Sequence, residues 1–268
     1  MGQASSWIVC AALALVSCQR EMAVPWQRAP LSTAALEQLA YPPFLVDAQA
    51  ASRYRQQGLA FRQQGDLERA IATLKIATAL DPRHTEGQVL LGWTQHLAGY
   101  AAPATAALQT ALTHNPDHVP ALNALGIVYL VDGQLEAAVD THRRAATLQP
   151  GNEIAHYNLS LAYQRLGQIE QAIAEAQTAT ELEPGNPHPW VALALAYWSG
   201  RDRSPEVGPE TSLETSIDFR AEAIANYRQA LSLDRRYTRR DYLDHLEQAG
   251  FSQEQIDQTE ALRQAAGL

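Results

Sequence analysis

Side chains able to do covalent or metal chemistry are few in this sequence. Cys10 and Cys18 are its only cysteines. The residues after Cys18 can therefore form no disulfide, no thiolate zinc site and no cysteine nucleophile. Lys75 is the only lysine and follows a leucine. The sequence thus lacks both a phosphate-binding Gly-Lys-Ser/Thr loop and a motif that would support a catalytic lysine.

Two histidines have the spacing of zinc ligands on a helix. His114 and His118 stand four residues apart in the stretch HNPDH, a spacing that puts two side chains on one helical face. Pro116 between them predicts a turn instead, so we expect no metal site. Carboxylate pairs such as Glu181 and Glu183 are typical of solvated polar faces.

Catalytic motifs are also absent. The sequence contains no G-x-S-x-G, H-E-x-x-H, G-x-G-x-x-G or kinase motif. Its net charge of −9 argues against general nucleic-acid binding, which requires a basic surface. We therefore expect no enzymatic activity, no cofactor, no small-molecule substrate and no nucleic-acid partner. The alternative is an accessory subunit of an enzyme complex.

An apolar run of twelve residues, Trp7 to Cys18, lies near the start of the sequence. A membrane-spanning helix needs about twenty apolar residues, and the run has the length of a signal-peptide hydrophobic region. Its last residues, LVSC, resemble the lipobox of bacterial lipoproteins. That resemblance implies that residues 1–17 are a signal peptide and that the thiol of Cys18 is acylated, which anchors the protein in a membrane.

Other interpretations of this segment stay open, because the leader MGQASSW contains no Lys or Arg and signal peptides usually begin with positive charge. The run can be a cleaved secretory signal or an uncleaved short anchor. Met1 and Gly2, with Ser6, also match the pattern for N-myristoylation.

Residues 18–50 are predicted to be a tether. The stretches VPWQRAP and YPPF contain prolines that interrupt regular structure. Between them, STAALEQLA is expected to form a short helix capped by Ser32. A tether of this length would hold a folded domain clear of a membrane surface.

The rest of the chain repeats itself with a period of 34 residues. Four columns of identical residues share this period: Pro82, Pro116, Pro150 and Pro184; Gly65, Gly99, Gly133 and Gly167; Ala70, Ala104, Ala138 and Ala172; and Ala77, Ala111, Ala145 and Ala179. A fixed period of this length indicates a repeat architecture in which each unit packs on its neighbours.

The repeat resembles the tetratricopeptide repeat, most clearly in LNALGIVYLVDGQLEAAVDTHRRAATLQP. Its signature positions hold Leu122, Leu125, Gly126, Tyr129, Ala138, Ala145 and Pro150. His142 departs from the pattern at the large-residue position of the second helix. The resemblance implies an all-α, right-handed solenoid of about five helix-turn-helix repeats over residues 51–237. The repeats are expected at 51–84, 85–118, 119–152, 153–186 and 187–237.

Two parts of the chain depart from the repeat. The fifth repeat carries an insertion at about 201–217, rich in Pro, Gly, Ser and Glu, which predicts a surface loop or, alternatively, an arm that contacts a partner. Residues 238–268 lack the signature and are predicted to be two capping helices separated at Gly250. Ser252 and Gln255 have the spacing of a capping box at the start of the second helix.

In the tetratricopeptide family, the first helix of each repeat lines a concave groove that binds partners. Carried onto this sequence, the resemblance assigns the groove to Arg55, Leu59, Arg62, Val89, Trp93, His96, Asn123, Ile127, Leu130, Tyr157, Asn158, Leu161, Gln164, Arg165, Val191, Leu195 and Trp198. We expect the aromatic residues to anchor a partner, because aromatic residues dominate binding hot spots. Asn123 and Asn158 can hold an extended peptide backbone.

These features together predict a non-enzymatic scaffold that binds a protein or peptide partner. The lipobox resemblance implies a lipoprotein of the bacterial envelope, facing the periplasm or the exterior; secretion is the alternative. The chain resembles tetratricopeptide lipoproteins that assist the assembly of envelope complexes such as pili, secretins and outer-membrane machinery. An assembly factor for photosynthetic membrane complexes is a second possibility within the same class.

Overall fold

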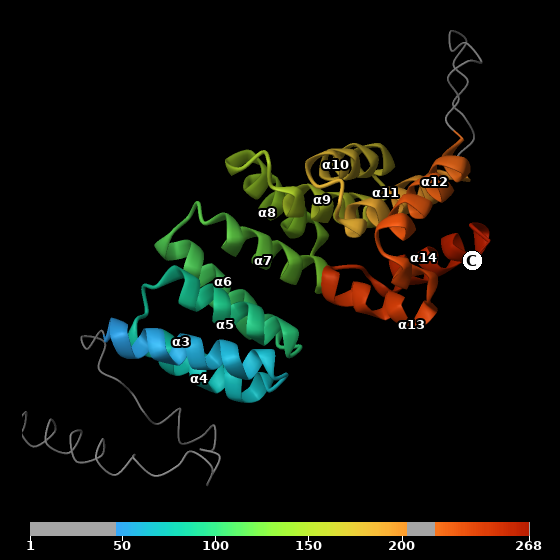
Figure 1. The fold of residues 1–268 in the computed structure, drawn as a ribbon. Helices are drawn as coiled ribbons and strands as arrows, with labels where there is room; N and C mark the ends of the chain where they lie inside the picture. Colours follow the sequence, from blue (N-terminus) through green and yellow to red (C-terminus); the bar gives the residue numbers. More distant parts are fainter. Residues whose placement is uncertain (1–46, 203–217, 268) are drawn as a thin grey trace, which may run out of the picture. The chain divides into compact units, whose positions relative to one another are not determined.

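The computed structural model describes residues 47–202 and 218–267, and within these ranges the regular secondary structure is helical. Consecutive helices form five pairs, one pair in each predicted repeat (Figure 1). The predicted signal peptide, Cys18, the tether before residue 47 and the insertion from residue 203 lie outside the described residues. The pairs are α3 Ala48–Gln63 with α4 Leu67–Leu80, α5 Thr85–Leu97 with α6 Ala101–His114, α7 Val119–Val131 with α8 Leu135–Leu148, α9 Glu153–Arg165 with α10 Ile169–Leu182, and α11 Pro187–Gly200 with α12 Phe219–Leu233.

Local sequence signals set the helix ends. Gly65, Gly99, Gly133 and Gly167 follow the first helix of a pair with φ between 71° and 81°, a left-handed conformation that glycine adopts at little cost. At the start of α7, His118 is the N-cap, and its Nδ1 accepts a hydrogen bond from the Ala121 N–H at 3.2 Å. The histidine that had zinc-ligand spacing with His114 is thus a capping residue.

The two helices of a pair approach closely because one of them carries a glycine. A Cβ atom added to Gly58 would lie 2.7 Å from the Leu74 side chain, and one added to Gly92 would lie 2.7 Å from that of Leu108. The periodic alanines of the second helices are at most 1% exposed. Small residues on one helix therefore receive large residues from the other, which is dense packing of the kind found in protein interiors.

The buried apolar residues form a large cluster in the C-terminal repeats and smaller ones in the N-terminal repeats. The large cluster runs from Leu130 in α7 to Ala266 after the last helix. The three smaller clusters include the buried Leu108 and Leu125 in the first, Leu74 and Leu91 in the second, and Leu122 in the third. None of the described helices is both long and apolar enough to cross a membrane.

After α12 the chain leaves the repeat pattern. It continues through η2 Arg235–Thr238, α13 Arg240–Leu243, η3 Asp244–Ala249 and α14 Gln253–Ala265. The first of the two predicted capping helices is thus a short α-helix followed by a 3-10 segment. Gly250, with φ 93°, separates it from α14, and Ser252 and Gln255 form the predicted capping box. We call residues 239–267 the C-terminal segment; it packs against α9, α11 and α12 (Figure 1).

Candidate binding groove

The residues predicted to line the groove fall into two groups in the structure. In the first three repeats all of them except Leu130 are half-buried on α3, α5 and α7, where a partner can reach them. This first group, the open groove, consists of Arg55, Leu59, Arg62, Val89, Trp93, His96, Asn123 and Ile127. The second group lies beneath the C-terminal segment.

A cavity of about 420 Å³ opens in the first group. It is lined by Arg62, Glu86, Val89, Leu90, Trp93, His118 and Pro120. Val89, Leu90 and Trp93 come from α5, whereas Arg62 comes from α3 and Pro120 from α7. The wall of the cavity is therefore mainly apolar, with charged groups at its edges, which is the usual composition of a ligand site.

Two aromatic rings lie close together in the open groove, and one of them, Trp93, also lines this cavity. The ring centroids of Trp93 and His96 lie 5.1 Å apart. Burial lowers the pKa of His96, because the apolar surroundings disfavour the charged imidazolium. At neutral pH this part of the open groove therefore presents two uncharged aromatic rings.

Of the charged side chains in and near the cavity, some form ion pairs and one does not. Glu86 lies 3.3 Å from Nε2 of His118, and a hydrogen bond with its own backbone together with His118 lowers its pKa. Arg55 lies 3.9 Å from Asp81. Arg62 makes no ion pair with any residue that the structure describes. The open groove therefore offers one unpaired cation beside Trp93.

The second group of predicted residues is covered by the C-terminal segment. We call this part of the concave face the covered groove. Its members are buried, apart from the half-buried Arg165: Leu130, Tyr157, Asn158, Leu161, Gln164, Arg165, Val191, Leu195 and Trp198. The sequence places these residues at the groove positions of their repeats, but they are not exposed to solvent.

Both apolar and polar contacts hold the C-terminal segment in this place. The ring of Phe251 lies 6.1 Å from that of Tyr157. Gln255 donates a hydrogen bond to the Leu161 carbonyl at 3.3 Å and a second one to the side chain of Gln164. Gln258 accepts a hydrogen bond from Gln164 at 2.8 Å. The contacts therefore involve the groove positions themselves and not the backs of the helices.

Models of the tetratricopeptide repeat match residues 55–102, 107–140 and 129–196, which together are just over half of the chain. The chain belongs to the tetratricopeptide repeat family. A comparison with curated proteins found no match.

Solved structures of similar fold agree with this assignment. The crystal structure of the MamA protein shares 23% identity over 71% of this chain and 94% of its own, with a TM-score of 0.55. MamA from Desulfovibrio magneticus RS-1 shares 21% identity over 70% of this chain and 96% of its own, with a TM-score of 0.57. A thermophilic TPR protein of Thermus thermophilus shares 21% identity over 82% of this chain and all of its own, with a TM-score of 0.56. The predicted fold class, an all-α tetratricopeptide solenoid, is confirmed.

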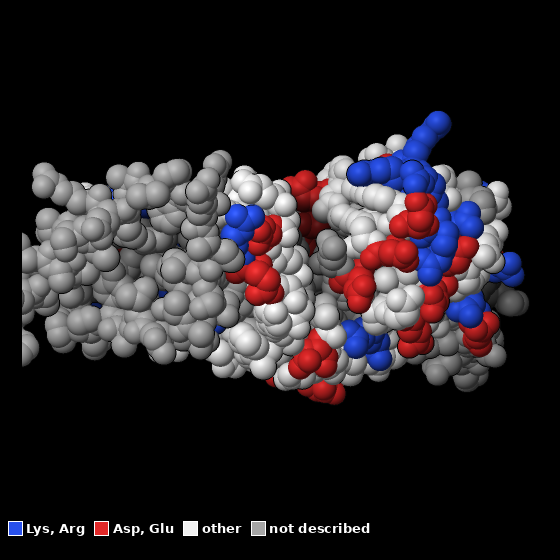
Figure 2. Space-filling view, turned by 90° about the horizontal axis from the view of Figure 1, so that it is seen from below, with Lys and Arg blue, Asp and Glu red and all other residues white. Residues whose placement is uncertain are grey.

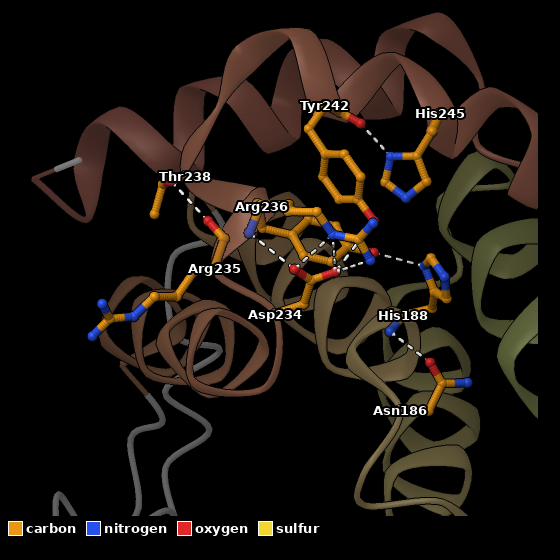
Figure 3. A network of polar contacts seen from close by, with 9 residues as sticks. Asn186, His188, Asp234, Arg235, Arg236, Thr238, Tyr242 and His245 are labelled. Atoms are coloured by element: carbon orange, nitrogen blue, oxygen red, sulfur yellow. Dashed lines mark hydrogen bonds and ion pairs between the residues drawn. The ribbon is translucent and has the colours of Figure 1, made fainter.

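The region around η2, just before the C-terminal segment of this tetratricopeptide repeat protein, is joined to α11 by a network of polar contacts that the sequence did not predict (Figure 3). The hydroxyl of Tyr237 lies 2.7 Å from Nδ1 of His188. The His188 ring also lies 5.7 Å from that of His245. Burial, helped by His245, lowers the pKa of His188 to about 4, so this ring is neutral at pH 7. No repeat column marks these residues; their only sequence signal is the local density of aromatic residues.

Charged residues near the same segment are mostly paired. Asp234 binds Arg236 at 2.8 Å, and Arg240 binds Asp244 at 2.7 Å. Figure 2 shows basic side chains beside acidic ones on the described surface. The basic stretch RRYTRR therefore does not form an uncompensated positive patch of the kind that binds nucleic acid. Within the described residues, no group of three or more His, Cys, Asp or Glu side chains could hold a metal ion.

Some buried polar atoms of the covered groove have no partner. Neither amide atom of Asn158 forms a hydrogen bond with a described residue. In the open groove the same holds for Oδ1 of Asn123. Buried polar groups are nearly always paired, so these atoms are candidates for binding the backbone of a ligand. The predicted role of Asn123 and Asn158 in holding a peptide remains a prediction.

Proposed function

We propose that this protein is a non-enzymatic scaffold that is anchored at a bacterial envelope membrane through acylated Cys18. Its open groove binds a segment of a partner protein and thereby assists the assembly of an envelope complex. Membership of the tetratricopeptide repeat family supports protein binding as the general activity. The cavity that Trp93 lines between α3, α5 and α7 carries the proposal, because it lies in the accessible part of the predicted groove.

The chemistry of the open groove suggests how a partner binds. An apolar side chain of the partner would enter the cavity against Val89 and Trp93. A carboxylate would then find Arg62, which has no acidic partner among the described residues. Burying the apolar side chain supplies affinity, and the charge selects orientation and partner.

The groove is tested by affinity capture from detergent-solubilised membranes, followed by calorimetric titration with the purified captured protein. Trp93→Ala removes the aromatic wall of the cavity, and we expect at least a tenfold loss of affinity. The matched control is Tyr100→Ala, which removes an exposed aromatic side chain outside the groove. Equal affinity for wild type and Trp93→Ala, with unchanged helix content, would refute the groove assignment.

The anchor is tested separately by membrane fractionation. Cys18→Ala is expected to release the protein from membranes, whereas the control Cys10→Ala leaves it there. Release by Gly2→Ala, with Cys18→Ala still bound, would show N-myristoylation instead. If the wild-type protein itself is found in the soluble fraction, the anchor proposal is wrong.

A further inference from the structure

The C-terminal segment occupies the place that a ligand takes in the open groove. Leu59, Trp93 and Ile127 hold equivalent positions on successive first helices, and the next two members of this series are Leu161 and Leu195. The first three are half-buried. Leu161 and Leu195 are 1% and 0% exposed, because the series continues beneath the C-terminal segment.

The manner in which α14 packs is that of a helix lying in a groove. Its buried face consists of Phe251, just before the helix, followed by Gln255, Thr259 and Leu262, each at most 1% exposed. Their spacing of three and four residues places them on one face of a helix. The opposite face is polar and includes Glu254 and Asp257, both exposed. An amphipathic helix with one such face is a common ligand of helical grooves.

The fit between the C-terminal segment and the covered groove is incomplete. The side chain of Asn158 is fully buried, yet neither of its amide atoms has a partner in the described structure. It lies beneath Gly250, whose added Cβ would be 3.5 Å from Asn158 Oδ1. A ligand that offered a hydrogen-bonding group at this point would bind with a contact that the C-terminal segment does not make.

We propose that the covered groove is a helix-binding site and that the C-terminal segment is its resident ligand. The partner that exchanges with it is an amphipathic helix with an aromatic anchor and side-chain amides on one face, and with a polar group that pairs with Asn158. This inference rests on the proposed function, since it extends the partner-binding surface of the scaffold from the open groove to the covered one.

Exchange requires that the C-terminal segment separate from the repeats without unfolding them. Hydrogen exchange of the wild-type protein measures this directly. We expect the amides of α14 to exchange at least tenfold faster than those of α9 and α11. Equal exchange in the three helices would show that α14 opens only with global unfolding, and the proposal would be overturned.

Binding is measured with a fluorescein-labelled synthetic peptide of residues 250–267, titrated into the full-length protein and followed by fluorescence anisotropy. Gly250→Ala is designed to open the site. An alanine there is strained by the φ of 93° and places a Cβ 3.2 Å from Leu130. The matched control is Gly267→Ala, which has φ 83° but nothing within 4 Å of the added Cβ. Both changes incur the left-handed strain, and only the first disturbs the covered groove.

We expect Gly250→Ala to bind the peptide at least tenfold more tightly than wild type and Gly267→Ala, because a larger fraction of its molecules has an empty site. A peptide carrying Phe251→Ala should lose at least tenfold of that affinity. The proposal would be overturned if all three proteins bound the peptide with equal affinity, or if none of them bound it, while circular dichroism shows intact helices.

Two further readouts separate this inference from its alternatives. Trp93→Ala should leave peptide binding unchanged, because Trp93 lies in the open groove. If the peptide does not bind while the Trp93→Ala test of the open groove succeeds, the proposed function stands and only the present inference fails. Light scattering should show that Gly250→Ala remains a monomer if the wild type is one. A dimer formed only by Gly250→Ala would assign the site to a second copy of the chain and overturn exchange with a partner.

Discussion

His142 is a buried imidazole at a position where two sister repeats carry leucine. Its equivalents are Leu74 and Leu108, and all three side chains pack against the glycine of the facing helix. His142 is 0% exposed, and neither ring nitrogen has a hydrogen-bond partner among the described residues. Burial lowers its pKa to about 3 and outweighs the nearby backbone of Gly126, which acts in the opposite direction.

This shift makes the stability of the folded protein depend on pH. In the unfolded chain the imidazole takes up a proton near its ordinary pKa of about 6.5, whereas in the folded protein it stays neutral down to about pH 3. Between these values the unfolded state binds more protons, so stability is lost as the pH falls. Below the unfolded-state pKa of about 6.5, the free energy of unfolding falls by about 1.4 kcal/mol for each pH unit. Between pH 7 and pH 5, protonation of His142 in the unfolded chain should therefore lower the stability by about 2 kcal/mol.

The test is His142→Leu, measured by urea unfolding at pH 7 and pH 5. Leucine fills the site without a desolvated polar group, so we expect the variant to be about 1–3 kcal/mol more stable than wild type at pH 7. Between pH 7 and pH 5 it should lose about 2 kcal/mol less stability than wild type. His188 also has a lowered pKa, but it is present in both proteins and cancels in this difference.

The control is His114→Gln, which replaces an exposed histidine at the end of α6. Its stability should follow the pH in nearly the same way as that of wild type. If His142→Leu and wild type lost equal stability between pH 7 and pH 5, His142 would not be held neutral by the folded protein. The reasoning from burial would then be refuted.

Two further predictions concern close packing and a buried hydrogen bond. Gly126→Ala places a Cβ 2.4 Å from the His142 ring and should lower the free energy of unfolding in urea by about 1–3 kcal/mol. This loss should fall by at least half when the same change is made in His142→Ala. The control Gly151→Ala, which has open space around the added Cβ, should change the free energy of unfolding little. Tyr227→Phe removes the hydroxyl that donates to the buried Tyr237 carbonyl at 2.8 Å and should cost about 1–3 kcal/mol. An unchanged urea midpoint for Tyr227→Phe would contradict the role given to that hydrogen bond.

The repeat helices could be predicted from the sequence because the signals are local and recur. Each periodic glycine marks the end of a first helix, and each periodic proline follows a second helix. Pro116 correctly predicted a turn in HNPDH, and the structure gives His118 a capping role there. His142 departed from the family pattern, and the structure explains why it can be accommodated: Gly126, on the facing helix, leaves room for its ring.

The covering of the groove could not be predicted in the same way. A repeat period tells which residues hold equivalent positions, but it does not tell which other part of the chain packs on them. Trp93 and Leu161 stand two periods apart and have equivalent places in their repeats, yet only Leu161 is buried. The difference depends on contacts between residues far apart in the chain, such as Gln164 with Gln255. The 34-residue period of the sequence gives no sign of these contacts.

The residue types of the groove nevertheless agree with its division into two parts. In the first repeat the groove positions hold Arg55, Leu59 and Arg62, whereas in the fifth they hold Val191, Leu195 and Trp198. Leaving the second set in water would expose a contiguous apolar surface, which folded monomers rarely do. Covering the second set therefore stabilises the fold, whereas the first set, which includes two arginines, stays half-buried in contact with water. A partner that displaces the C-terminal segment must itself cover this apolar surface, which is why we expect its helix to be amphipathic.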